Sequence, residues 1–399
     1  MSVLSPEVPS ISPTDPPRSA QFPSWLERLI IVFGCLLGIA VNCFVELPAL
    51  PYIVHGDNDF MCFYSAAQLA GSGELYNPSA IARAEARLWD SPRALPYTRL
   101  PFYAAMLVPL RFFSYRHAYW IWQLGSLAAA LLFVYFWPAP RRWIAAMAMC
   151  WSMPLLHCFF MGRDLIVLMP VLAVSLALLF RGKHFAAGCV LSLCLIKYNL
   201  FLPIPLLIVG KRLWRFGGGM VAGGAALMAI SFAVAGWSWP WQYVAVLHLP
   251  VTTPRYAGMP NLHGLFSSLP PSIWLEAVGT CAVLVATWLV IRSGDIARAV
   301  SATLISGLLI SYHAFFGDAL ILVPACLLLL SAAPSVPLRL AAWFLLCPVA
   351  HLPFVLPGSP YPPPVVLLLP LLVMVTEAIL AGDGPWRAFA RRSRPEFRG

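Results

Sequence analysis

Apolar runs of about 20 residues, the length that crosses a bilayer, recur along this chain from about residue 28 to residue 381. A bilayer core offers no hydrogen-bond partners, so a spanning segment must satisfy its backbone as a helix or within a closed barrel. The runs are continuous and lack the alternation of barrel strands. Only 11% of the residues are charged and 60% are hydrophobic, which excludes a soluble globular chain. The sequence therefore predicts an all-α polytopic membrane protein.

Basic residues indicate how these spans are oriented, because Lys and Arg concentrate on the cytoplasmic side of a membrane. Arg18 and Arg28 precede the first run, and each later inward run ends near Lys or Arg. This pattern predicts cytoplasmic termini and an outer segment from about 49 to 115. The net charge of +10 follows the same rule and does not indicate nucleic-acid binding. About ten spans are predicted, at 28–48, 116–137, 143–160, 165–180, 216–238, 272–292, 296–312, 316–333, 337–355 and 362–381.

Composition divides the chain into three regions. Residues 1–24 are rich in Pro and Ser and are predicted to be a disordered cytoplasmic N-terminus. Residues 25–382 form the transmembrane domain, whose first run is predicted to be an uncleaved signal anchor. Residues 383–399 form a basic cytoplasmic tail.

Two apolar segments do not fit the pattern of single crossings. Segment 184–210 has basic residues at both ends and is predicted to be a helical hairpin with Lys197 near its turn. Segment 100–113 is apolar but too short for a comfortable crossing, so it is predicted to be re-entrant or interfacial.

The unusual polar residues fall at the predicted outer ends of the spans. Ionisable groups at membrane depth are costly and usually face a cavity or a partner. One outward-facing polar cavity is therefore predicted from the positions of Asp57, Asp59, Arg99, Arg163 with Asp164, Lys197, Arg255, Asn261, His263, His313 and Asp318.

Several of these residues also have a structural alternative. Asp59 or Asn58 is a preferred N-cap for a short amphipathic helix that would place Phe60, Phe63 and Tyr64 towards lipid or core. Asp318 could cap a later helix in the same way. The remaining alternatives are a water-exposed turn for Arg163 and Asp164, outward snorkelling for Lys197 and a satisfied interfacial position for His313.

The first outer segment also carries a motif. It reads D-F-x-x-x-Y-x-A-A-x-x-x-G-x-G-x-L-Y from Asp59 to Tyr76, and PYTRLPFYAAMLVPLRFF follows at 96–113. This combination resembles the family 87 glycosyltransferases, membrane enzymes of the GT-C fold, over about residues 28–330. Later landmarks are similar but depart in places: Lys197-Tyr198 stands where the family has Lys-Pro, and Gly162-Arg163-Asp164 where it often has Gly-Gln. Further matches are Tyr97, Pro101, Pro109, Asn261, His263, Gly264 and Asp318.

The resemblance implies a GT-C-like bundle in the inner (plasma) membrane with an active site facing the exterior. It also implies a polyprenyl-phosphate sugar donor, usually of mannose, and a lipid or glycan acceptor. Asp59 is then the expected general base, and Lys197, Arg99, Arg163 and Arg255 the expected donor-phosphate ligands. The residues expected to bind substrate are Asp57, Tyr64, Tyr97, Asn261, His263, His313 and Asp318.

The sequence contains no Gly-rich phosphate loop within a βαβ pattern, so a nucleotide is not the predicted donor. No cofactor is predicted, and a divalent metal held by Asp57 and Asp59 stays an open alternative. Two other functions also stay open. One is secondary transport of a polar or anionic small molecule. The other is transfer of a larger glycan by a ligase of the same fold.

Overall fold

A computed structural model describes residues 24–56, 58–88, 95–139, 142–252, 258–267, 269–270, 273–332, 335–355 and 363–380. Within these ranges every regular element is a helix, which confirms the predicted all-α class. The predicted N-terminus 1–24, apart from Ser24, and the predicted basic tail 383–399 lie outside the described residues.

Four helical segments are long and apolar enough to cross a membrane alone. They are α6 (Tyr115–Phe136), α10 (His184–Leu191) continued by η3 (Ser192–Phe201), α12 (Trp214–Ala235) and α15 (Ile273–Ser293). Two further spans are bent pairs: α7 (Arg142–Cys150) with α8 (Met153–Met161) bends by 57°, and α18 (Val336–Leu346) with the segment Pro348–Phe354 bends by 67°. By length and composition, the chain is therefore a polytopic membrane protein.

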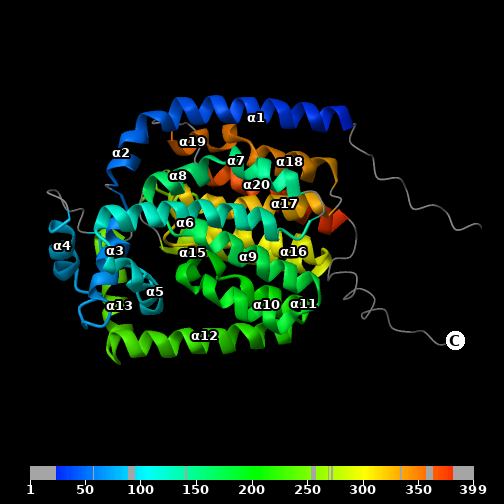
Figure 1. Cartoon of the computed structure of the whole chain (residues 1–399). Helices are drawn as coiled ribbons and strands as arrows, with labels where there is room; N and C mark the ends of the chain where they lie inside the picture. The colour runs from blue at the N-terminus through cyan, green and yellow to red at the C-terminus, as the bar shows by residue number, and fades with distance from the viewer. Residues whose placement is uncertain are drawn as a thin grey trace, which may run out of the picture.

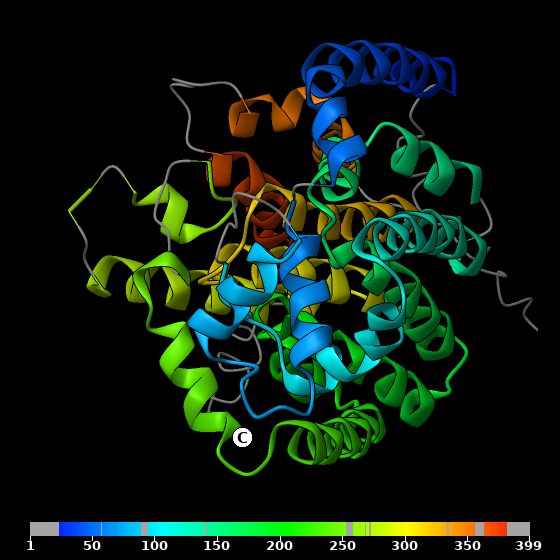
Figure 2. The ribbon, with the colours of Figure 1, turned by 60° about the vertical axis from the view of Figure 1, so that its left-hand side comes forward.

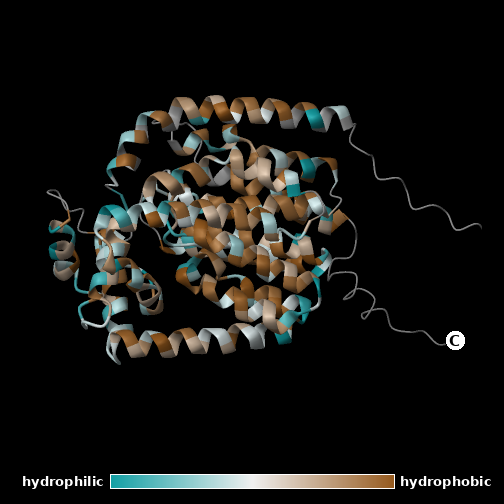
Figure 3. Ribbon diagram, viewed as in Figure 1, coloured by the Kyte–Doolittle hydropathy of each residue, from teal (hydrophilic) through white to brown (hydrophobic). Residues whose placement is uncertain are grey.

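Further apolar helices complete the bundle and lie lengthwise beside these spans (Figure 1). Figure 3 shows that the bundle is mainly hydrophobic. Each of the ten predicted spans coincides with one of these helices or helix pairs. These further elements are the 23-residue α1 (Ser24–Glu46), α9 (Leu165–Phe180), α16 (Ile296–Ile310), η5 (Phe316–Ile321) with α17 (Leu322–Ser331), and α20 (Pro363–Leu380).

Burial separates an interior from a lipid-facing rim. Every α17 residue from Leu322 to Leu329 is buried, and α16 is buried from Ala299 to Leu309. The rim helices α1 and α12 lie at opposite edges of the bundle in Figure 1 and expose large apolar side chains such as Phe33 and Val221. Exposed apolar side chains suit the bilayer core, which contains no water and so does not make their exposure unfavourable.

Short helices gather at one end of the bundle, which we call the α3 end (Figures 1 and 2). Segment 100–113 forms α5 and η2 there, and both are too short to cross a bilayer. Its backbone is held against a span, since the Phe102 amide donates to Ser231 Oγ of α12 at 3.1 Å. The elements at this end include α2 (Leu50–His55), α3 (Phe60–Leu69), α4 (Pro78–Ala86), α5 (Pro101–Leu107), η2 (Val108–Phe112) and α13 (Trp239–Leu247). The remaining short elements are η1 (Leu47–Ala49), η4 (Pro250–Thr252), α14 (Leu262–Leu265), η6 (Pro348–His351) and α19 (Leu352–Val355).

The segment predicted as a hairpin turns back near Lys197. The helical course breaks at this residue, whose φ and ψ are −126° and 54°. The returning arm is α11 (Ile204–Lys211). Beside its start, the Leu200 carbonyl lies against Gly307, near the C-terminal end of α16. At the other end of the arm, Lys211 Nζ donates to the carbonyl of Gly294, just before α16 begins. The arm therefore runs antiparallel to α16, and the turn presents Lys197 at the α3 end.

The outgoing arm packs against α12 through glycines. A Cβ at Gly219 would lie 2.0 Å from the carbonyl oxygen of Phe185, and one at Gly188 would lie 2.0 Å from that of Phe216. Small residues allow two helix backbones this close in a membrane.

Replacing Gly219 with alanine should therefore destabilise the protein, because the Cβ meets a backbone oxygen that cannot rotate away. The expected loss is about 1–3 kcal/mol, typical of overpacking. Gly218→Ala is a matched control: the same change one residue earlier meets nothing within 4 Å. Melting temperatures of the two purified variants in detergent compare them directly. Equal melting temperatures would contradict the close contact between α10 and α12.

Candidate active site

The start of α3 places the Asp59 side chain in the interior of the α3 end. Asn58, not Asp59, caps the helix: its Oδ1 accepts from the Phe60 amide at 3.1 Å, whereas the Asp59 side chain makes no capping bond. The Asn58 side-chain amide also donates to the Phe160 carbonyl at 2.9 Å. The Asp59 amide donates to the Met161 carbonyl at 3.0 Å. The backbone is thus fixed on both sides, and the cap predicted for this turn falls to Asn58.

Helix α3 itself is buried and does not lie along an interface. Eight of its ten residues are buried. Its aromatic side chains pack on α6, with the Phe60 ring stacked on Trp122 at a centroid distance of 5.4 Å and the Tyr64 ring 5.3 Å from Tyr115. These aromatic side chains were predicted to face either lipid or the protein core, and they face the core. The tightness of this packing gives Asp59 a rigid support.

Arg99 enters the site from the segment before α5. Its Nε and Nη2 donate to Asp164 Oδ2 and Oδ1 at 2.5 and 3.2 Å, a two-bond pairing that fixes the guanidinium plane. Its Nη1 also donates to Thr98 Oγ1 at 3.1 Å. The Asp164 side chain is only 1% exposed, so the predicted water-exposed turn is wrong for this residue.

Lys197 is the second cation of the site and is held by two carboxylates. Its Nζ contacts Asp318 Oδ1 and lies 3.6 Å from Asp164 Oδ1. Asp318 Oδ2 accepts from the Phe315 amide at 2.9 Å. Asp318 therefore both caps η5 and pairs with Lys197. Burial by itself raises the pKa of Asp164, but Arg99 and Lys197 outweigh it and lower that pKa to about 2. The carboxylate is therefore ionised at neutral pH.

Arg163 is the third cation and pairs with Asp59. Arg163 Nε lies 3.1 Å from Asp59 Oδ2, and the guanidinium sits 4.8 Å from the centre of the Phe315 ring. Gly162, the residue before Arg163, ends α8 with a φ of +62°. A Cβ at this position would lie 2.7 Å from Asn58 Oδ1. A glycine at this position therefore brings the end of α8 against the start of α3.

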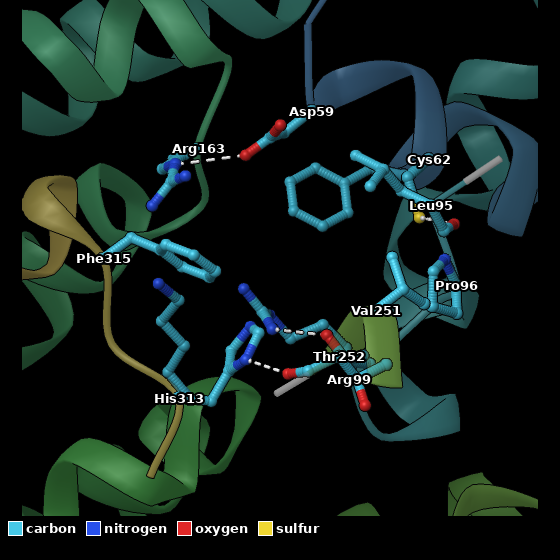
Figure 4. Close-up of a pocket in the computed structure, with 13 residues that line it drawn as sticks. Asp59, Cys62, Leu95, Pro96, Arg99, Arg163, Val251, Thr252, His313 and Phe315 are labelled. Carbon is cyan, nitrogen blue, oxygen red and sulfur yellow. Dashed lines mark hydrogen bonds and ion pairs between the residues drawn. The ribbon is translucent and has the colours of Figure 1, made fainter. Parts of the chain in front are cut away.

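These groups surround one cavity of about 470 Å³. Asp59 and Arg163 lie at one end of it and Arg99, Thr252 and His313 at the other (Figure 4). The lining residues are Asp59, Cys62, Phe63, Leu95, Pro96, Thr98, Arg99, Arg163, Lys197, Val251, Thr252, His313 and Phe315.

His313 lines the cavity as a neutral imidazole. Its Nδ1 lies 2.6 Å from the Thr252 carbonyl, an acceptor, so Nδ1 carries the proton and donates it. Burial lowers the pKa of His313 to about 4, and Arg99 adds to this effect. In this tautomer Nε2 keeps a lone pair and can accept a hydrogen bond, for example from a hydroxyl.

Five residues predicted to bind substrate do not line the cavity: Asp318, the buried partner of Lys197, and four others that have partners elsewhere. Tyr64 OH donates to the Phe113 carbonyl at 2.7 Å, and Tyr97 is 1% exposed with its OH 3.4 Å from the Leu100 carbonyl. Asn261 caps α14 and donates to the Ser311 carbonyl at 2.7 Å. His263 Nδ1 lies 3.0 Å from Glu276 on α15. Each of these four side chains has a partner within the protein, whereas the predicted Asp57 and Arg255 lie outside the described residues.

Asp164 was counted among the residues of the predicted cavity but was given no role in binding or catalysis, although it contacts two of the cations. The signal for it is an acidic residue directly before the apolar run of α9, where an unpaired charge would be costly. Thr98, Thr252 and Phe315 were missed because nothing in the sequence separates them from ordinary loop residues.

The arrangement combines carboxylates and cations without the ligand set of a metal centre. In the described part of the chain, no three His, Cys, Asp or Glu residues come together closely enough to hold a metal ion. The alternative of a metal between Asp57 and Asp59 involves a residue outside that part. Buried arginine and lysine suit an oxyanion such as phosphate, and the Asp59 carboxylate, 23% exposed, suits a proton acceptor.

Comparison with known proteins adds one finding. The model of glycosyltransferase family 87 matches residues 97–316, more than half of the 399 residues. The matched range contains Arg99, Arg163, Asp164, Lys197 and His313. No curated protein and no solved structure gave a significant match.

Proposed function

Because this chain belongs to glycosyltransferase family 87, we propose that it transfers a hexose, mannose in the first instance, from a polyprenyl-phosphate donor to a lipid or glycan acceptor. The observation that carries the proposal is the cavity shared by Asp59 and three cations, Arg99, Arg163 and Lys197. A donor whose leaving group is a phosphate needs cations at that group, and an acceptor hydroxyl needs a base.

The proposed reaction is a single displacement with inversion at the anomeric carbon. The acceptor oxygen forms a bond to that carbon as the bond to the phosphate oxygen breaks. Asp59 takes the proton of the acceptor hydroxyl, and polyprenyl phosphate leaves with one additional negative charge. The three cations stabilise this charge, and they act more strongly in a buried site than in water. His313, with a free lone pair on Nε2, is proposed to accept a hydrogen bond from a sugar hydroxyl.

The position of the cavity supports an active site on the outer face of the inner (plasma) membrane. The cavity lies at the α3 end of the bundle, and basic residues that the charge rule assigns to the cytoplasm, Lys211 and Arg298, lie at the other end of α16. A site at one end of the spans also favours transfer over transport, because a transporter binds its substrate near the midplane.

The test is mass spectrometry of the glycolipids in a strain lacking this gene. One glycolipid should lose a single hexose, and the truncated acceptor should accumulate. Wild-type protein should restore the missing hexose, and a variant with Asp59→Asn should not. An unchanged lipid profile together with a loss of small-molecule uptake would contradict glycosyl transfer and favour a transporter.

A further inference from the structure

Three consecutive backbone carbonyls beside the cavity, those of residues 98, 99 and 100, accept hydrogen bonds from tyrosine hydroxyls. Residues 95–100 belong to no helix, so their carbonyls need partners outside a helical ladder. All three tyrosine side chains are buried, which places these bonds away from water. In the order of the carbonyls, the donors and distances are Tyr243 at 3.3 Å, Tyr76 at 2.7 Å and Tyr97 at 3.4 Å.

Tyr76 makes the shortest of these bonds. A distance of 2.7 Å is typical of a good O–H···O hydrogen bond, whereas the 3.3 and 3.4 Å of the other two are long. Gly71 and Gly73 of the sequence motif have φ values of +86° and +78°, a conformation that favours glycine and turns the chain after α3. Leu75 and Tyr76, which end the motif, are 2% and 5% exposed. The motif therefore ends in a buried side chain that reaches the backbone of Arg99.

Arg99 is held at both ends, by Tyr76 at its carbonyl and by Asp164 at its guanidinium. Nε and Nη2 donate to Asp164, and Nη1 donates to Thr98 Oγ1. These bonds occupy three of the five N–H groups of a guanidinium, so one N–H on Nη1 and one on Nη2 remain for a ligand in the cavity. Two such neighbouring donors suit two oxygens of one phosphate. Their direction depends on both anchors, because the side chain connects a fixed backbone to a fixed carboxylate.

We propose that Tyr76 is a positioning residue for Arg99, whose guanidinium its hydroxyl aims at the donor phosphate. Without the hydroxyl, the Arg99 carbonyl loses its short bond and the segment before α5 is free to shift. The remaining guanidinium donors then meet the phosphate in a poorer geometry, and small displacements of a binding group are costly. The inference rests on the proposed function, because it takes Arg99 as a ligand of the phosphate. It gives the G-x-G-x-L-Y part of the motif a role in donor binding.

Tyr76 tests this role more selectively than Tyr243 does. The Tyr243 hydroxyl lies 3.3 Å from the Tyr198 hydroxyl as well as 3.3 Å from a backbone carbonyl. Tyr198 directly follows Lys197, which also lines the cavity, so a change at Tyr243 would disturb two cations. Replacing Tyr76 with phenylalanine removes the bond to Arg99 and keeps the ring.

The test is a double-mutant cycle, measured by equilibrium binding of radiolabelled undecaprenyl phosphate to the purified full-length protein in nanodiscs. Tyr76→Phe should weaken binding by about fivefold, since residues that act on one another are coupled. In an Arg99→Gln background the same change should weaken binding by less than about twofold, because the hydroxyl acts through the guanidinium.

Tyr64→Phe is the matched control. Tyr64 is likewise 5% exposed and donates at 2.7 Å to a backbone carbonyl, that of Phe113, and neither residue lines the cavity. This variant should leave binding unchanged and lower the melting temperature by about as much as Tyr76→Phe does, since both lose a buried hydrogen bond. A purely structural role for the Tyr76 hydroxyl predicts the same fall in melting temperature without any change in binding.

Each result decides a different point. Unchanged binding by Tyr76→Phe, or equal weakening in both backgrounds, would overturn the positioning role while the proposed donor stands. Wild-type affinity in the Arg99→Gln protein would remove Arg99 from the phosphate site and overturn the role as well. Absence of binding by the wild-type protein would overturn the proposed donor class and this inference with it. If Arg99→Gln is not monodisperse in size-exclusion chromatography, Arg99→Met combined with Asp164→Asn, which removes one charge of each sign, replaces it as the background.

Discussion

Replacing Asp59 with asparagine should lower the rate of sugar transfer by about 10²- to 10⁴-fold, the usual contribution of a general base. The change keeps the shape of the side chain and removes its ability to take a proton. It should leave the fold intact, because Asn58 rather than Asp59 caps α3. The measurement is transfer of labelled hexose from a polyprenyl-phosphate donor in membranes that contain equal amounts of each variant.

Glu74→Gln is the matched control, because Glu74 follows α3 on the same segment and lies outside the cavity. Its Oε2 lies 3.9 Å from Arg83 Nη2, and both side chains are exposed. It should transfer sugar at close to the wild-type rate. Unchanged transfer by a correctly folded Asp59→Asn protein would remove Asp59 as the base. His313 would then be the next candidate to test, since its neutral imidazole lines the same cavity.

Replacing Asp164 with asparagine should lower the free energy of unfolding by about 3 kcal/mol or more, as expected when one partner of a buried ion pair is removed. Asp164 is 1% exposed and neutralises Arg99 through two hydrogen bonds. The asparagine oxygen can accept only one of these two bonds, and Arg99 and Lys197 both lose the charge that neutralises them. The fall in melting temperature of the purified protein in detergent measures the effect.

A second variant separates stability from function at the same place. Arg99→Met combined with Asp164→Asn removes one charge of each sign, and we expect it to recover most of the lost stability. It should stay impaired in transfer, because a cation proposed to bind the phosphate is gone. The surface pair offers a control: Arg83→Gln should change stability by less than about 1 kcal/mol. A melting temperature unchanged by Asp164→Asn would contradict the ion pairs described for Arg99 and Lys197.

The membrane architecture followed from the sequence because hydropathy acts locally. A run of about 20 apolar residues predicts a span whatever the rest of the chain does. The segment around Lys197 was predicted as a hairpin on the same grounds, from an apolar stretch with basic residues at both ends. The places where the structure bends a span, between α7 and α8 and between α18 and η6, were not predicted. A bend depends on which neighbours satisfy the freed backbone groups.

The residue that caps α3 could not be predicted from the local sequence. Asn58 and Asp59 are both preferred N-cap residues, so the sequence left two candidates for one position. The contacts of Asn58 with Phe160 and Tyr119, about a hundred and about sixty residues away along the chain, decided between them. Asp59 was thereby left to pair with Arg163.

The sequence alone determined that polar residues would collect at one end of the spans, since a charge within an apolar run is costly wherever it occurs. Only the tertiary structure decided which of them share a cavity. Arg99 and Asp164 are 65 residues apart and Lys197 and Asp318 are 121 apart, yet each pair is in contact, whereas Asn261 and His263 take structural partners elsewhere. The physical reason is that the cost of a charge depends on its own burial, which the apolar pattern predicts. The identity of its partner depends on the distance between segments, which only the packing of the helices determines.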